Sequence, residues 1–370
     1  MSELFAQAHT SSQRRIKMFG SLEVRVPAMR GKMGSRTYYA CLMPMSGVPQ
    51  FFKFTNWAGI SPEDREQRVL NEKRVPDLAG YIAENEDDYL FSSITASYKG
   101  EPKFEPFMEG ANIGVLILQL GDEFIINDGQ HRCAGIVRAL EAGVPIGKDA
   151  ISVLLFPWET TERVQQMFSD LNRFVQKTSK SLDILYDKRD ELAASTLAMI
   201  DQLPVFKELT DKENVSLGVK STKLFTLAAL YDANAELLRG RKDDVDAATA
   251  LLVDYWSAVA EHMPDWTKVL KGQKLALELR QEKISSHSTV LRALGGLGID
   301  LLKGPSWQDQ LEALEAIDWS KKNPEWEGIC VSANSVLSNR QARAATKAFI
   351  KAKLGLSLTE SEAKSLPVAA

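Results

Sequence analysis

The stretch GVLILQLGDEFIINDGQHR, residues 114–132, decides the fold of the N-terminal half of this chain. Two apolar runs, 114–120 and 123–127, flank Gly121-Asp122, a dipeptide typical of tight two-residue turns. These runs predict two buried strands that pair as a β-hairpin. Apolar residues then recur at helical spacing through residues 129–142, so the second strand is expected to lead directly into a helix.

Further strand-like and helical segments alternate on both sides of this stretch. Strands are expected where β-branched and aromatic residues gather between Pro and Gly, and helices where apolar residues recur every three or four positions. The predicted strands are residues 22–26, 37–42, 50–54, 89–97 and 151–156, and the predicted helices are residues 75–85, 160–172 and a segment that begins at Ser61.

The C-terminal half has a different pattern. From about residue 181 the strand signal fades and amphipathic helices follow one another. The sequence therefore predicts a mixed α/β (α+β) fold, with a loose leader at residues 1–20, an α/β domain at 21–185 and a helical domain at 186–370. The expected helices of the last domain are residues 187–202, 222–239, 243–262, 288–302, 307–317 and 340–354.

The composition of the chain excludes several classes of protein. Of its 370 residues, 44% are hydrophobic and 25% are charged, which is ordinary for a soluble globular protein. The net charge of −4 excludes a protein that coats nucleic acid through overall basicity, although a local basic face suffices for DNA binding. Residues 1–20 lack a signal-peptide core, and no stretch has the roughly 18 apolar residues of a membrane span. A cytoplasmic location is expected.

The cysteines and histidines do not predict a metal site. Cys41, Cys133 and Cys330 are odd in number, far apart and without a CxxC pair. The four histidines do not complete a zinc-binding spacing with them. Free thiols of this kind indicate a reducing compartment, which also favours the cytoplasm.

Polar residues stand at the expected junction of strand and helix, in the segment Asp128-Gly129-Gln130-His131-Arg132. Free amide groups at a helix start, with the positive end of the helix dipole, form a site for anions. Gly129 permits a close backbone approach or a positive φ. Arg132 can hold a phosphate through two parallel hydrogen bonds, and His131 can donate or titrate near neutral pH. Asp128 can cap the helix, hold a metal ion or orient water.

A purely structural role of this turn is the alternative. Strand–Asp–Gly–helix turns are common, and a capping Asp128 followed by a solvated Gln-His-Arg face needs no ligand. Spacing alone does not decide between the two roles.

Asp128 to Arg132 is also the motif for which DGQHR domains are named, and the chain resembles the DndB family of such proteins. Three later stretches share the resemblance: MFSDLNR at 167–173, SKSL at 179–182 and LYDKRD at 185–190. It extends from about Arg74 into the C-terminal helices. The resemblance implies a protein of the bacterial system that replaces a non-bridging phosphate oxygen of DNA by sulfur. Its implied role is a DNA-binding regulator of the modification genes, not the sulfur-transferring enzyme.

DGQHR domains in turn resemble the ParB/sulfiredoxin-like superfamily, whose strand–turn–helix box binds nucleotide phosphates. The sulfiredoxin box reads Gly-Cys-His-Arg, and this chain has Gln130 where that box has its cysteine. Because Gln cannot form a thiolate, reductase chemistry is not expected and a phosphate-binding role remains. Cys133, on the helix, is expected to be packed and unreactive.

The resemblance also implies that Asp170, Asn172 and Arg173 complete a pocket beside the turn. The same segment has an ordinary structural explanation as a polar helix end, with Asn172 near the C-cap. Basic residues in two places are candidates for DNA contact. They are Lys177 and Lys180, among which acidic residues are interleaved, and Arg340, Arg343, Lys347 and Lys351, which share one face of an expected helix.

Three functions stay open at this level. A regulator would bind promoter DNA of the modification genes, under the control of a nucleotide such as ATP with Mg²⁺. An enzyme, either a nucleotide triphosphatase or a nucleotide-dependent nicking enzyme, would use Asp128 or His131 as its catalytic candidates. A scaffold would contact other DNA-modification proteins without chemistry of its own. The sequence leaves open the DNA site, the nucleotide, the metal dependence and whether the chain forms homo-oligomers.

Overall fold

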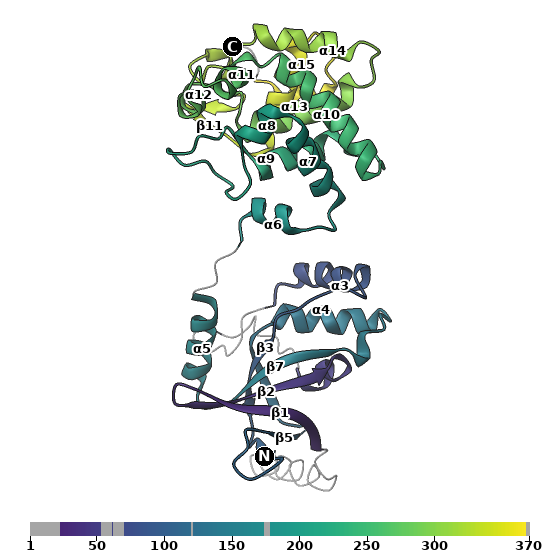
Figure 1. Cartoon of the computed structure of the whole chain (residues 1–370), viewed down its shortest axis with the longest axis vertical. Helices are drawn as coiled ribbons and strands as arrows, with labels where there is room; N and C mark the ends of the chain where they lie inside the picture. Colours follow the sequence, from purple (N-terminus) through teal and green to yellow (C-terminus); the bar gives the residue numbers. More distant parts are fainter. Residues whose placement is uncertain (1–22, 53–60, 62–69, 120, 174–177, 368–370) are drawn as a thin grey trace, which may run out of the picture. The chain divides into compact units, whose positions relative to one another are not determined.

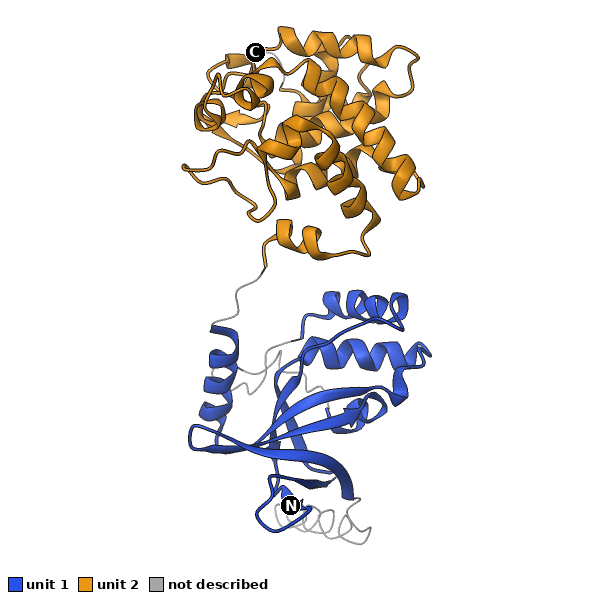
Figure 2. Cartoon of the chain, viewed as in Figure 1, with its two compact units in different colours: residues 1–176 blue, residues 177–370 orange. Residues whose placement is uncertain are grey.

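The computed structural model describes residues 23–52, 61, 70–119, 121–173 and 178–367. The chain divides into two compact units, residues 1–176 and 177–370 (Figure 2). The division lies N-terminal to the boundary expected near residue 185. The expected leader at 1–20 lies outside the described residues, as does the segment of the helix expected after Ser61. No helix in the described ranges is long and apolar enough to cross a membrane.

Unit 1 is built on a mixed seven-stranded sheet with the strand order β4-β5-β1-β2-β7-β3-β6. Neighbouring strands are antiparallel except β3 and β7, which are parallel. The strands are β1 (Glu23–Met33), β2 (Arg36–Pro44), β3 (Ile94–Lys99), β4 (Lys103–Pro106), β5 (Ile113–Gln119), β6 (Glu123–Asp128) and β7 (Ala150–Pro157). The prediction of a mixed α/β fold is confirmed.

The prediction that residues 114–127 form a β-hairpin is wrong, because the two strands do not pair with each other. Both strands form, but β5 pairs with β1 and β4 while β6 pairs with β3 at the far edge of the sheet. The turn between them is fastened by a side chain of β3. The Tyr98 hydroxyl accepts the Gln119 N–H at 3.4 Å and donates to the Asp122 carboxylate at 2.5 Å. The sheet therefore curves until strands from its two ends meet at this turn.

Helices cover one face of the sheet and one of its edges (Figure 1). The apolar side chains of α4 and of the short α2 pack on the sheet in one core with Ile82 of α3. Helix α5 lies against β6. The helices are α2 (Val48–Phe51), α3 (Val75–Glu84), α4 (Gln130–Glu141) and α5 (Thr161–Arg173).

Two expected strands differ from the structure. A strand is predicted at residues 50–54, but residues 48–51 form the helix α2. Pro49 lies in the first turn of this helix, where proline favours a helix start. Residues 53–54 lie outside the described ranges. The strand predicted at 89–97 begins only at Ile94, after an irregular stretch in which Tyr89 and Phe91 pack as an aromatic pair.

Unit 2 is a helical unit with its own core, centred on the buried side chains of Trp256, Trp266, Trp326 and Tyr255. All six expected helical segments contain helices, and 222–239 also includes the short strand β9. Five further short helices were not predicted. The helices are α6 (Lys180–Tyr186), α7 (Glu191–Gln202), α8 (Pro204–Leu209), α9 (Leu227–Leu237), α10 (Val245–Glu261), α11 (Pro264–Leu270), α12 (Ala276–Glu282), α13 (Ser288–Leu301), α14 (Trp307–Gln310), α15 (Arg340–Lys353) and α16 (Glu360–Ser365). The strands β8 (Thr210–Asp211) and β9 (Phe225–Thr226) pair with each other, as do β10 (Val331–Ser332) and β11 (Ser335–Val336).

Candidate functional site

The turn between β6 and α4 depends on Gly129. This residue is the N-cap of α4 and has a φ of +101°, a conformation that side-chain-bearing residues rarely adopt. A Cβ atom at this position would lie 3.0 Å from Nη2 of Arg132 and 3.2 Å from a side-chain carbon of Ile94. Glycine is therefore required both for the backbone conformation and for the space that the Arg132 guanidinium occupies.

The terminal nitrogens of the Arg132 guanidinium donate hydrogen bonds to neighbouring protein groups. Its Nη2 donates to the Asp128 carboxylate at 2.6 Å and to the Ser93 carbonyl at 3.1 Å, and its Nη1 donates to the Ser92 hydroxyl. The two-pronged phosphate contact expected of Arg132 is thus occupied by protein groups. Asp128 does not cap α4, because its carboxylate is turned to this guanidinium and Gly129 is the N-cap.

A cavity of about 250 Å³ opens at the turn. The segment from Ile126 to Arg132 forms one wall. Arg74 and Leu78, at the start of α3, and Phe168 and Asn172 of α5 form the others. All five residues of the motif, Asp128 to Arg132, line this cavity. The turn therefore has space beside it for a ligand.

Two buried hydrogen-bond donors at the cavity have no partner among the described residues. They are Nδ2 of Asn127 and Nε of Arg132, and both residues line the cavity. The Asn127 side chain is 2% exposed, and its Oδ1 accepts a hydrogen bond from Ser97 at 2.9 Å. A buried donor without an acceptor is costly, so two beside one cavity indicate that a ligand or ordered water supplies acceptors there.

The first turn of α4 adds backbone donors. Its N-cap makes no side-chain hydrogen bond, and the first amide with an intrahelical acceptor is that of Cys133, which donates to the Gly129 carbonyl at 2.9 Å. Nε2 of His131 accepts the Asn71 N–H at 3.2 Å, so the neutral imidazole carries its proton on Nδ1. The turn is therefore rich in donors and suits a negatively charged or carbonyl-bearing ligand.

The other residues expected at the pocket are placed differently. Asn172 lines the cavity, and its Nδ2 donates to the Phe168 carbonyl at 2.8 Å. Asp170 is exposed, accepts a hydrogen bond from Gln166 and does not line the cavity; Arg173 is exposed and does not line it either. Cys133 is fully buried, and burial raises the pKa of its thiol to about 12, which agrees with a packed residue.

The cavity fits the phosphate-bearing end of a nucleotide better than a bound metal. Asp128 is the one carboxylate that lines it, and no group of three or more metal-binding side chains occurs in the described parts of the chain. The two unpartnered donors and the amides of α4 would hold phosphate oxygens, and Phe168 offers an aromatic face for a base. A nucleotide's Mg²⁺ would meet Asp128 alone.

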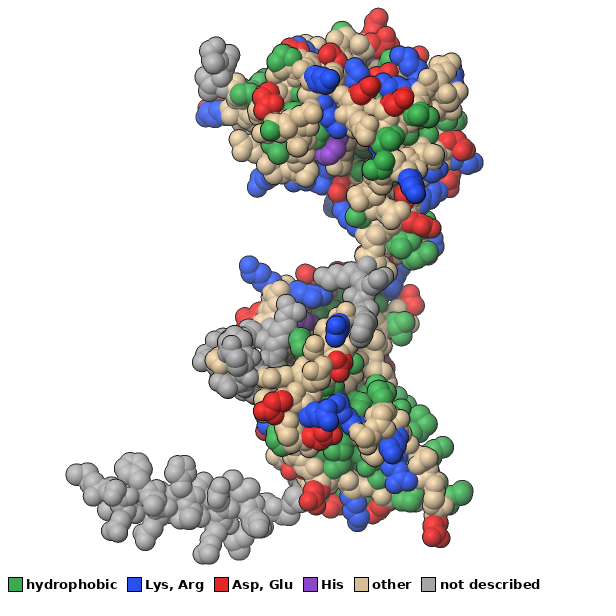
Figure 3. Space-filling view, turned by 90° about the vertical axis from the view of Figure 1, so that its left-hand side faces the viewer, with side chains coloured by type: hydrophobic (Ala, Val, Ile, Leu, Met, Phe, Trp, Pro, Cys, Tyr) green, Lys and Arg blue, Asp and Glu red, His purple; other side chains and the backbone are tan. Residues whose placement is uncertain are grey.

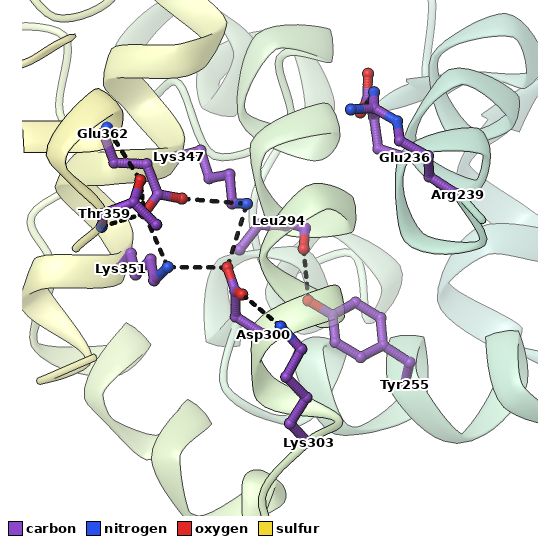
Figure 4. A network of polar contacts seen from close by, with 10 residues as sticks. All are labelled: Glu236, Arg239, Tyr255, Leu294, Asp300, Lys303, Lys347, Lys351, Thr359 and Glu362. Atoms are coloured by element: carbon purple, nitrogen blue, oxygen red, sulfur yellow. Dashed lines mark hydrogen bonds and ion pairs between the residues drawn. The ribbon is translucent and has the colours of Figure 1, made fainter. Parts of the chain in front are cut away.

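Two of the predicted DNA-contact lysines lie in an ion-pair network of unit 2 (Figure 4). Lys351 is 4% exposed and donates to Asp300 and Glu362, each at 2.9 Å. Lys347 lies 3.3 Å from the same two carboxylates. The shared helical face that the sequence indicated exists, but at these two positions it is turned towards acidic side chains of the same unit.

The remaining DNA candidates differ in their surroundings. Lys180 pairs with Asp232 at 2.5 Å, and Lys177 lies outside the described residues. Arg340 is exposed and Arg343 is partly exposed, and neither side chain has an ion pair with a described residue. On the face drawn in Figure 3, basic side chains are scattered over both units with acidic ones among them. Among the candidates that the structure describes, Arg340 and Arg343 are thus those without an ion pair to a described residue.

The chain thus combines an α/β unit, which has a cavity at its glycine turn, with a helical unit that has its own core. The family model named DndB, described as DNA-sulfur modification-associated, matches residues 26–357. The chain therefore belongs to the DndB family and is associated with DNA sulfur modification. No curated protein and no solved structure matches it.

Several residues of the site were not predicted from the sequence. Ser92 and Ser93 hold the Arg132 guanidinium, and Arg74 and Leu78 come to the cavity from the start of α3. Only Asn127 gave a usable signal, since it is a polar residue at the end of a buried apolar run.

Proposed function

We propose that this chain is a cytoplasmic DNA-binding regulator of a DNA sulfur-modification system, and that the cavity at the Asp128–Arg132 turn binds a nucleotide that controls it. Membership of the DndB family supports the modification system. The observation that carries the nucleotide is the pair of unpartnered buried donors, Asn127 Nδ2 and Arg132 Nε, beside the amides of α4. Arg340 and Arg343 supply free cations for DNA.

The test is a titration of promoter DNA of the modification genes with the full chain, in the absence and presence of ATP, GTP or CTP with Mg²⁺. Binding is expected to be sequence-selective and salt-dependent, and one nucleotide is expected to change the apparent Kd. Asn127→Leu keeps the approximate size of the side chain but removes its donor, together with the Oδ1 that accepts from Ser97, so this variant should bind DNA without the nucleotide effect. Selective DNA binding that no nucleotide alters would refute the nucleotide part alone.

Nucleotide hydrolysis is the second candidate function. Asp128 Oδ2 is bound by Arg132, but the Asp128 side chain is 47% exposed at the cavity, where it could orient a water molecule. Phosphate release from ATP, GTP or CTP that is lost in Asp128→Asn would establish this activity. If the chain neither hydrolyses a nucleotide nor selects DNA but co-purifies with modification proteins, a scaffold role replaces both proposals.

A further inference from the structure

Unit 2 contains a second cavity, of about 290 Å³, at which two helices begin. Thr226, the N-cap of α9, and Ala229 of its first turn line one side. His287, the N-cap of α13, lines it together with Ser286 and Ser288. Helices α9 and α13 have 11 and 14 residues, so the positive ends of two helix dipoles converge on one space.

The side chains around this cavity are cationic. Arg280 and Lys283 line it, and no Asp or Glu does. Arg280 has no carboxylate partner among the described residues and instead donates to four carbonyls, those of Leu217, Gly218, Ser221 and Ala276. Lys283 lies 3.2 Å from Asp318, a largely exposed carboxylate outside the lining. The cavity therefore combines fixed positive charge with helix N-termini.

Buried hydroxyls beside the cavity have no partner. Ser286 lines the cavity at 7% exposure, and its side chain makes no hydrogen bond with a residue that the structure describes. The neighbouring Ser285 is 1% exposed, and its Oγ is likewise without a partner. Ser285 does not line the cavity, so the unpartnered hydroxyl of Ser286 is the independent indication of a bound polar ligand.

The imidazole of His287 lines the cavity as a hydrogen-bond donor. Its Nδ1 accepts the Thr289 N–H at 3.2 Å, which leaves the proton of the neutral ring on Nε2. Burial lowers the pKa of this imidazole, and the ammonium of nearby Lys321 lowers it further. A neutral imidazole that donates a hydrogen bond among positive charges can bind an anion without transferring a proton to it.

We infer that this cavity is a binding site for a phosphate monoester dianion, separate from the turn of unit 1. The phosphate lies at the starts of α9 and α13, between Arg280, Lys283 and Ser286. Val215, Leu217 and Leu224 form an apolar wall beside it, which suits a small organic group on the ester. The dianion offers an acceptor to the unpartnered Ser286 hydroxyl and opposite charge to Arg280 and Lys283.

Histidine-selective NMR of the full chain tests this inference, with inorganic phosphate as the probe. The chain has four histidines, and two of them report on different cavities: His287 on this one and His131 on the turn of unit 1. The His287 ring signals are expected to move and saturate, whereas those of His262, which is paired with Glu315, stay fixed. An equal response to sodium chloride at the same ionic strength would overturn the inference.

Ser288→Asp is the decisive variant. Ser288 is the first residue of α13, where an acidic side chain stabilises the helix, so this variant is expected to fold. It places a negative charge in the cavity and should raise the Kd for phosphate at least about tenfold. Lys322→Ala changes one charge at an exposed residue outside the lining and should leave the Kd unchanged. Undiminished binding by Ser288→Asp would refute the site.

Two further probes identify the source of the phosphate. AMP carries it on a free nucleotide, and a 5′-phosphorylated oligonucleotide carries it on a DNA end, with the 5′-hydroxyl oligonucleotide as control. The probe that moves the His287 signals at the lowest concentration identifies the ligand. Movement of the His131 signals alone, by any probe, would place phosphate binding in unit 1 and contradict the inference.

Discussion

The turn of unit 1 and the basic face of α15 in unit 2 both stand out in the sequence as places where an anion could bind. At the turn, the charged pair of Asp128 and Arg132 lies beside a cavity with two donors still unpartnered. On α15, Lys347 and Lys351 meet Asp300 and Glu362 and have little left to offer a ligand. The comparison shows that a sequence pattern determines which side chains share a helical face. The tertiary neighbours of that face determine whether its side chains are free to bind a ligand.

The largest effect is expected from breaking the α15 network. Lys351→Ala leaves the carboxylates of Asp300 and Glu362 bridged by Lys347, with Lys303 paired to Asp300 alone. Loss of one partner from a buried network should lower the free energy of unfolding of unit 2 by about 3 kcal/mol. Urea unfolding measures it. Lys353→Ala, which removes an exposed pair with Glu325, should cost at most about 1 kcal/mol; equal costs would show that the network is not structural.

The next effect is expected at the turn. Gly129→Ala should lower the stability of unit 1 by about 2–3 kcal/mol, from the positive φ and from crowding against Arg132. Gly143→Ala is the matched control, because Gly143 has a φ of +86° but no atom within 4 Å of the added Cβ, and about 1 kcal/mol is expected. Urea midpoints compare them, and indistinguishable midpoints would mean that Arg132 is not packed on Gly129.

Acid should break the ion pairs of the α15 network in a defined pH range. Burial by itself would raise the pKa of Asp300 and of Glu362, but hydrogen bonds with Lys351 outweigh it and hold both at about 2. Because these folded-state pKa values lie below the unfolded values of about 4, the stabilisation is complete above pH 4 and is lost as the pH falls towards 2.

The corresponding loss in unit 2 is about 2 kcal/mol once solvent screening is allowed for. Urea midpoints between pH 7 and 2 measure it. The difference between wild type and Lys351→Ala should shrink over the same range. A difference that stays constant down to pH 2 would exclude the two carboxylates as its source.

The smallest effect concerns DNA. Replacement of Arg340 and Arg343 by Ala should reduce the slope of log Kobs against log salt by about 2, because each removes one phosphate contact. Lys347→Ala should leave the slope unchanged, since Lys347 faces the carboxylates of its own unit. The opposite result, a slope that depends on Lys347 and not on the arginines, would reverse the comparison drawn for α15.

Local patterns predicted the elements of the fold well where one segment suffices to define them. The strands of 114–127, the glycine turn with positive φ and the long helices of unit 2 all follow from periodicity and residue type. The pairing partners of β5 and β6 could not be predicted this way, because β1, β4 and β3 come from other segments of the chain. Short helices such as α8 and α11, which begin at a proline, lack the length that makes periodicity visible.

The candidate site was predictable in its centre and not in its surroundings. The motif residues are contiguous, so the sequence alone placed them together at a helix start. Ser92, Ser93 and Arg74 come from segments 39 to 58 residues away from Arg132, and no local signal connects them with it. That Asp128, Ser92 and Ser93 hold the two terminal nitrogens of Arg132, while its Nε has no partner among the described residues, is a property of the folded unit.

The separation of β5 from β6 has a consequence for how unit 1 holds together. Residues before Gly121 supply β1 to β5, and residues after it supply β6 and β7. Because β7 lies between β2 and β3 and β6 pairs with β3, the two segments interlock, and neither can leave without breaking three ladders of hydrogen bonds. A chain nicked at Gly121 should therefore stay assembled as a non-covalent pair of fragments, and new chain ends could be placed there by circular permutation.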